Sequence, residues 1–214
     1  MKILLLFVAL SASCALSEPV ALFNGKDLTG WNPAPLPGGG AVNVLSNGIV
    51  ECGIGDPLSG LAYTNTPPTM NYELALEAMR VEGSDFFIAL TLPVEKSFCT
   101  VIIGGWGGGL CGLSSFDYAD ASENQWAEGL RLENNRWYAL RVRVTPGVLQ
   151  VFLNNDLYTA RIEYEDASRL SLRSGDIEKT KPLGLATYRT RALWRNFTLT
   201  PITALQPSDK PRVE

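Results

Sequence analysis

The chain has 214 residues, and its 22 Asp and Glu outnumber its 18 Lys and Arg, which gives a net charge of −4. An acidic chain lacks the basic surface that nucleic-acid binding needs, so we expect no nucleic-acid partner. The hydrophobic content of 46% is high enough for a folded core and excludes a disordered chain.

The first 17 residues have the pattern of a targeting segment. Lys2 precedes an apolar run over residues 3–10 and then several small residues, which predicts a signal peptide at Met1–Ser17. The run is too short to span a bilayer, so we expect an exported protein, periplasmic or extracellular, with no transmembrane segment in the mature chain. Lipid anchoring at Cys14 is less favoured because no Leu or Val stands three residues before it. We expect one domain at 18–203 and a polar C-terminal tail at 204–214.

Beyond this segment the chain reads as β-structure. Asn24-Gly25 follows two apolar residues and precedes Trp31, a pattern typical of a hairpin that opens a β domain. Alternating or apolar runs predict strands, with Pro93 ending the second of them and a turn or short 3₁₀ helix near 166–170. The predicted strands are 71–81, 86–92, 99–103, 137–144, 148–153, 182–188 and 192–200. No window has a sustained helical stripe, so the sequence predicts an all-β sandwich or jelly roll.

Three cysteines follow the predicted signal peptide, which leaves at least one of them unpaired within the chain. Cys99 and Cys111 flank a glycine-rich loop and are candidates for a disulfide across a hairpin. The other interpretation is that Cys52, Cys99 and Cys111 are all small buried apolar residues.

Three carboxylates lie three residues apart in the most polar part of the chain. Asp117, Asp120 and Glu123 offer the oxygen ligands that Ca²⁺, Mg²⁺ or Mn²⁺ prefer, so a metal site is one interpretation. Asp117 and Glu123 are also candidate catalytic carboxylates. The alternative is a solvated loop capped by Asp and Ser, and no cofactor is certain.

Asp85 is the other candidate catalytic carboxylate. It precedes an apolar strand, where burial could raise its pKa and suit it to act as a base. The alternative is an aspartate that caps the turn at residues 83–84. Trp106 lies in the glycine-rich loop and Trp126 follows the acidic loop, so both indoles are candidates to stack on the flat face of a bound ligand.

The last predicted turn carries further candidates. Tyr188, Arg189 and Arg191 can hydrogen-bond the hydroxyl groups or a negatively charged oxygen of a ligand. The alternative is a charged hairpin tip.

Several segments resemble one family of carbohydrate enzymes. Residues 22–31 read LFNGKDLTGW, 135–138 read NRWY, 151–155 read VFLNN, 183–185 read LGL and 194–197 read WRNF. Together they resemble the 3-keto-disaccharide hydrolase-like family, also described as a 3-keto-glucoside 1,2-lyase and 3-keto-2-hydroxy-glucal hydratase family. The resemblance covers about residues 22–202 and implies a concanavalin A-like (LamG-like) jelly roll of two antiparallel sheets. The middle of the chain resembles an exported, planctomycete-type subgroup.

The resemblance implies a hydrolase or a lyase/hydratase acting on 3-keto-glycosides, with a carbohydrate as ligand or substrate. The chain departs from the family at two places. Residues 83–90 contain no arginine where many members read like NSGIFLR, and 186–188 read ATY where many have a histidine. The chain contains no histidine at all. A non-catalytic carbohydrate-binding module on the same fold, or a structural envelope protein, therefore stands as the alternative.

Overall fold

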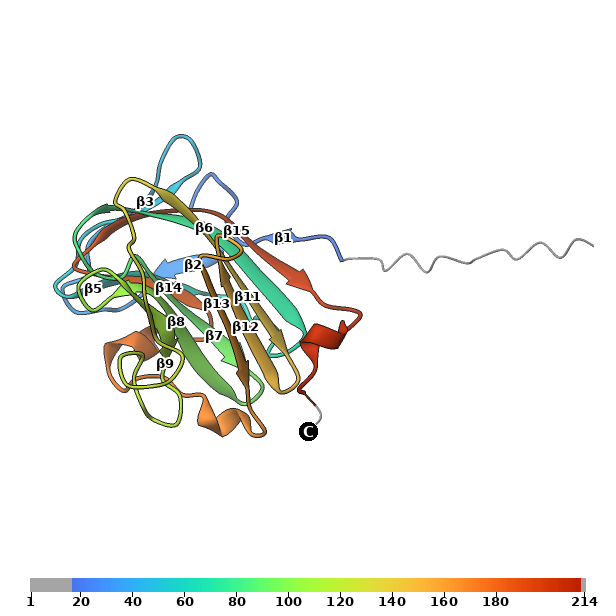
Figure 1. Ribbon diagram of the computed structural model, residues 1–214. Coiled ribbons are helices and arrows are strands. Elements are labelled where there is room, and N and C mark those ends of the chain that lie inside the picture. Colours follow the sequence, from blue (N-terminus) through green and yellow to red (C-terminus); the bar gives the residue numbers. More distant parts are fainter. Residues whose placement is uncertain (1–16, 213–214) are drawn as a thin grey trace, which may run out of the picture.

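Residues 17–212, which the computed structural model describes, fold into two antiparallel β-sheets packed face to face (Figure 1). The larger sheet has the order β13 (Tyr158–Glu163), β12 (Val148–Leu153), β11 (Trp137–Thr145), β6 (Tyr72–Glu82), β15 (Arg191–Pro201), β4 (Val50–Cys52) and β3 (Val42–Val44), and β1 (Val20–Ala21) also pairs with β15. The smaller sheet has the order β10 (Glu128–Gly129), β9 (Leu110–Ser114), β8 (Ser97–Gly105), β7 (Ile88–Val94), β14 (Gly184–Tyr188), β5 (Leu58–Tyr63) and β2 (Trp31–Pro33). The predicted all-β jelly roll is confirmed.

Short 3₁₀ helices lie in the connections: η1 (Ala167–Arg169), η2 (Asp176–Thr180) and η3 (Pro207–Asp209). The first of them is the turn expected near 166–170. No helix within residues 17–212 is long and apolar enough to cross a membrane. The predicted signal peptide lies almost entirely outside the described residues.

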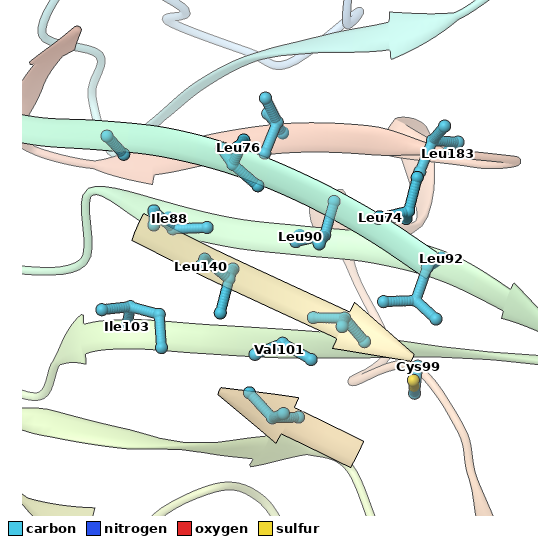
Figure 2. Packing of buried hydrophobic residues seen from close by; sticks show 14 of the residues in the cluster. Leu74, Leu76, Ile88, Leu90, Leu92, Cys99, Val101, Ile103, Leu140 and Leu183 are labelled. Atoms are coloured by element: carbon cyan, nitrogen blue, oxygen red, sulfur yellow. The ribbon is translucent and has the colours of Figure 1, made fainter. Parts of the chain in front are cut away.

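The core forms where the apolar faces of the two sheets meet. In β6 the side chains alternate, so that Leu74, Leu76 and Ala78 are buried while their neighbours in sequence face outward. Figure 2 shows Leu74 and Leu76 in the same layer as Leu90 of the opposite sheet. Each large apolar side chain buried here contributes about 1.5–3 kcal/mol to folding.

The LFNGKDLTGW segment does not form the expected hairpin. β1 pairs with β15 in the larger sheet and β2 pairs with β5 in the smaller sheet, so the segment connects the two sheets. Gly25 does adopt the predicted left-handed turn conformation, with φ +70°. Trp31 is buried as expected, and its indole Nε1 donates a hydrogen bond to the Leu22 carbonyl at 2.8 Å.

The strand ladders correct one further expectation and decide between two interpretations of the cysteines. β7 continues through Pro93, which faces Phe98 in the ladder with β8, so the proline does not end the strand. Cys99 and Cys111 do not pair, because the register of β8 and β9 sets Cys111 opposite Ile103, four positions from Cys99. All three cysteines are free and buried, and burial raises the pKa of the Cys111 thiol to about 11.

The polar C-terminal segment packs across the outside of the larger sheet. Asp209 in η3 is only 1% exposed. Its carboxylate accepts two hydrogen bonds from the Arg143 guanidinium, at 2.6 and 2.7 Å. The segment is therefore held to β11 by a nearly buried ion pair.

Candidate functional site: a hollow on the outer face of the smaller sheet

The main candidate site is a hollow on the outer face of the smaller sheet, which we call the outer hollow. Short outward-facing side chains on neighbouring strands, Thr100 of β8 and Ser114 of β9, leave room there, and Ile102 adds an apolar wall. The hollow has a volume of about 380 Å³, within the range for small-molecule sites. Around its walls lie Asp85, Phe86, Trp106, Arg173, Asp176 and Tyr188.

Asp85 enters the hollow from the loop before β7. Its Oδ1 accepts a hydrogen bond from the Phe86 backbone N–H at 2.8 Å, and its Oδ2 accepts one from the Gly107 N–H at 3.1 Å. The side chain is half-buried. The carboxylate thus links two loops at the mouth of the hollow and has a fixed orientation.

Trp106 lies at the tip of the glycine-rich loop between β8 and β9. Its indole side chain is 43% exposed and its backbone is left-handed, with φ +50°. Gly104, Gly107 and Gly108 around it also have positive φ, a conformation that glycine adopts at little cost. The loop therefore presents a flat, accessible indole, as expected for a residue that stacks on a sugar.

A buried arginine that the sequence analysis did not single out supports this loop. Arg80 is 5% exposed and donates to the Gly108 carbonyl at 3.0 Å and the Leu132 carbonyl at 2.7 Å. Burial lowers the pKa of its guanidinium. The burial of Arg80 could have been predicted from the sequence, because Arg80 follows Leu74, Leu76 and Ala78 at the inward-facing positions of β6.

The last predicted turn contributes only one of its three candidates to the hollow. Tyr188 at the end of β14 lines it, with its ring 5.7 Å from that of Phe86. Arg189 instead forms an exposed ion pair with Asp56, and Arg191 pairs with Glu51 on the larger sheet. The two arginines are therefore not part of this site.

Trp126 is also outside the hollow. Its ring packs against the main core and meets Phe116 edge-on, with ring centroids 6.0 Å apart. Its Nε1 is buried and has no hydrogen-bond partner among the described residues. The Trp126 side chain therefore packs within the protein and does not offer an exposed surface for stacking.

The acidic loop does not form the expected three-carboxylate metal site. Asp117 points to Arg169, which donates from Nε at 2.9 Å and holds the pKa of that carboxyl below its usual value. Asp120 pairs with Arg173 at 2.7 Å, and Glu123 accepts the backbone N–H of Asp120. Within residues 17–212 no group of three Cys, Asp or Glu is placed to hold a metal ion. Asp117 and Glu123 also do not line the outer hollow with Asp85.

The outer hollow is roofed by residues 171–180, a segment that the sequence analysis did not assign to the site. Thr180 at the end of η2 donates a hydrogen bond to Thr91 Oγ1 at 2.8 Å, which ties the roof to β7. Arg173 and Asp176 bring a cation and a carboxylate to the wall. No local sequence motif identifies Arg173 and Asp176 as site residues, because only the tertiary fold brings them to the hollow.

Several solved structures with this architecture have carbohydrate-related names, and three matches illustrate the range. Carbohydrate-binding module CBM66 from Bacillus subtilis is 14% identical, with a TM-score of 0.53, and the match covers 80% of this chain and 95% of that one. A putative glycosyl hydrolase from Parabacteroides distasonis is 15% identical, with a TM-score of 0.52 and coverage of 86% and 93%. A Bacillus subtilis protein of unknown function with a galectin-like fold is 10% identical, with a TM-score of 0.60 and coverage of 87% and 97%. At these identities the likeness defines the fold, a lectin-like β-sandwich.

The sequence itself places the chain more narrowly. Residues 18–200 match the model of the 3-keto-alpha-glucoside-1,2-lyase-like domain, and this chain belongs to that family. No curated protein sequence matches it significantly. The planctomycete-type subgroup stays a prediction.

Membership of the family gives the two departures in the sequence a structural meaning. The segment without the arginine contains Ala89, and the segment without the histidine contains Ala186 and Tyr188. These segments are neighbouring strands, and Ala186 faces Ala89 directly in the ladder. Both segments line the same outer hollow, the first through Asp85 and Phe86 and the second through Tyr188.

Proposed function

We propose that this protein binds a carbohydrate in the outer hollow and acts there on 3-keto-glycosides as a lyase or hydrolase. The observation that carries the proposal is the placement of Asp85, fixed by two backbone N–H groups, beside the exposed indole of Trp106 in one hollow. Family membership supports the substrate class. We also propose that the protein is exported, because the pattern at Met1–Ser17 is typical of a signal peptide.

The reaction requires a base and a group that stabilises negative charge. In a 3-keto sugar the proton on C2 is acidified by the neighbouring carbonyl. Asp85 would take this proton, the electron pair would pass to the C3 oxygen as an enolate, and collapse of the enolate would break the bond from C1 to its substituent. Arg173, held by Asp120, would offset the charge on the oxygen. The departing oxygen gains a proton, and water then adds to the unsaturated sugar.

The test is turnover of 3-keto-trehalose by the purified protein, with release of glucose as the readout. We expect Asp85→Asn to lower kcat by about 100-fold or more, the usual contribution of a positioned base. Glu77→Gln is the matched control, because Glu77 lies on the larger sheet and pairs with Arg195. Absence of turnover with and without Ca²⁺, Mg²⁺ or Mn²⁺, or an unchanged kcat in Asp85→Asn, would contradict the catalytic proposal.

A second candidate is a binding module that carries out no reaction. The pairing of Ala89 with Ala186 favours it, because small apolar side chains stand on the two strands where the family pattern has polar ones. Calorimetry with trehalose and short glucans separates the two candidates. Binding without turnover of 3-keto-trehalose supports the module.

A further inference from the structure

The proposed elimination needs a second proton transfer, to the oxygen that leaves C1. An alkoxide is a poor leaving group, so the bond from C1 to its substituent breaks slowly unless the departing oxygen gains a proton. Histidine is the side chain that most often supplies such a proton near neutral pH, and the chain contains none. The proton therefore comes from another group that lines the outer hollow, or from water.

The charged groups that line the hollow are poorly suited to give a proton. Asp176 accepts a hydrogen bond from the Lys179 ammonium group at 2.7 Å. Asp85 accepts two hydrogen bonds from backbone N–H groups, so both carboxylates are held as acceptors. A guanidinium does not lose its proton in proteins, so Arg173 can offset negative charge but cannot act as an acid. The neutral side chains of the lining remain.

The aliphatic hydroxyls of the lining are weak acids, and two of them already have partners. Ser114 Oγ donates to a carboxylate oxygen of Asp120. Thr100 Oγ1 lies 3.1 Å from Thr91 Oγ1, and the Thr100 side chain is only 1% exposed. The third hydroxyl, on Ser174, belongs to the roof segment. A phenol is a much stronger acid than any of these groups or an indole N–H.

Tyr188 supplies the phenol of the hollow, and its ring is fixed while its hydroxyl is open. The backbone N–H of Tyr188 donates to the Phe86 carbonyl at 3.1 Å, and the two rings pack together. Because Phe86 directly follows Asp85, the phenol and the proposed base lie on adjoining segments of the lining. The Tyr188 hydroxyl has no hydrogen-bond partner among residues 17–212, so its proton is available to a ligand.

We propose that Tyr188 is the general acid of the site and gives its phenolic proton to the oxygen that leaves C1. The inference rests on the proposed function and adds a catalytic residue to it. Asp85 takes the C2 proton, the electron pair forms the double bond between C1 and C2, and the C1–O bond breaks as the oxygen takes the proton of Tyr188. Water then adds to C1 while the phenolate accepts one of its protons, and Asp85 returns its proton to C2. Both side chains are restored, and the sum of the steps is hydrolysis.

Two substrates that differ only in the leaving group test this assignment. Methyl 3-keto-α-glucoside releases an alkoxide and needs an acid, whereas 4-nitrophenyl 3-keto-α-glucoside releases a phenolate that is stable without one. We expect Tyr188→Phe to lower kcat for the methyl glycoside by about 100-fold or more and to leave kcat for the nitrophenyl glycoside nearly unchanged. Tyr63→Phe is the matched control, because it removes the same hydroxyl from a ring that packs against Trp31 instead.

Exchange of the C2 hydrogen in D₂O, followed by NMR, separates the acid from the base. This exchange requires removal of the C2 proton but no departure of the leaving group. Tyr188→Phe should therefore retain it, and Asp85→Asn should lose it. A general distortion of the hollow in Tyr188→Phe would instead lower the exchange rate together with kcat for both glycosides.

The possible outcomes separate this inference from the proposed function. If the wild-type protein converts neither glycoside, the proposed function is wrong and the role of Tyr188 with it. If the wild type converts only the nitrophenyl glycoside, no acid operates in the site and only the role of Tyr188 is wrong. The same conclusion follows if both glycosides are converted but Tyr188→Phe lowers kcat for the two equally, or for neither.

Discussion

The outer faces of the two sheets follow the same alternation but carry opposite kinds of side chain. On the larger sheet, long charged side chains pair with one another, as Arg195 does with Glu77 and Arg143 with Asp209. On the smaller sheet, short side chains such as Thr100 and Ser114 border a hollow. The larger sheet also has a hollow beneath residues 200–209, but the charged side chains that line it pair with one another. The comparison teaches that the polar groups on the larger sheet satisfy one another, whereas short side chains on the smaller sheet leave room for a ligand.

The aromatic residues of the two faces differ in the same way. On the larger sheet the Arg195 guanidinium lies 4.0 Å from the ring centroid of Trp137, and that of Arg141 lies 4.2 Å from the ring centroid of Phe152. Those rings already have partners. Trp106, beside the hollow, is 43% exposed. Ligand binding is therefore expected on the smaller sheet, while the larger sheet serves stability.

The largest expected effect on stability comes from breaking an ion pair on the outer face of the larger sheet. Asp209→Ala would leave the guanidinium of Arg143 without its main partner in a largely buried position, at a cost of about 3 kcal/mol in the free energy of unfolding. Urea denaturation measures this loss. Trehalose affinity measured at a temperature where the variant is folded should match that of the wild type. A change in affinity would mean that the two faces are coupled.

The same ion pair predicts a pH dependence of stability. Hydrogen bonds from Arg143 hold the pKa of Asp209 below its usual value. The stabilisation is therefore fully present above the pKa of an unfolded aspartate, about 4, and is lost as the pH falls through the lower folded-state pKa. We expect the stability difference between the wild type and Asp209→Ala to shrink below about pH 4. A difference that stays constant down to pH 2.5 would contradict this role of the pair.

Trp106→Ala is expected to weaken binding and leave stability unchanged, which is the opposite of what we expect for Asp209→Ala. Loss of the stacking surface should weaken trehalose binding by about tenfold, which corresponds to about 1.4 kcal/mol. The free energy of unfolding should change little, because the indole is exposed at a loop tip. Calorimetry and urea denaturation of the same preparation measure both quantities. An unchanged affinity for trehalose would show that the outer hollow is not the sugar site.

The smallest effect is expected at Asp117. Its pair with Arg169 is exposed on both sides and screened by solvent, so Asp117→Ala should hardly change the melting temperature. Addition of millimolar Ca²⁺ should shift the melting temperatures of wild type and variant equally. A Ca²⁺-dependent stabilisation that disappears in the variant would restore the metal interpretation of this loop.

Much of the fold was predictable from local patterns. Alternation places Leu74, Leu76 and Ala78 on one face of a strand whatever the rest of the molecule does. The connection between Leu22 and Trp31 was predicted wrongly, because its turn chemistry is local but the strands on either side of it pair with distant partners. The sequence left open whether Cys99 and Cys111 form a disulfide or are buried thiols, and the register of β8 and β9 decides for buried thiols.

The site was only partly predictable. Asp85, Trp106 and Tyr188 were identified as candidates from their residue types and positions, and all three line one hollow. Trp126, Arg189 and Arg191 were equally plausible by type but lie elsewhere. Arg173 was missed, because a polar loop gives no indication of which surface it will cover.

By itself, the sequence determined the all-β class, the family and the inward faces of the main strands. These properties depend on the period of side chains along a strand and on turn residues, which act over a few positions. The tertiary structure alone decided which strands became neighbours. That choice set Ala186 beside Ala89 and brought residues 171–180 over the smaller sheet, so the site exists only where segments distant in sequence meet.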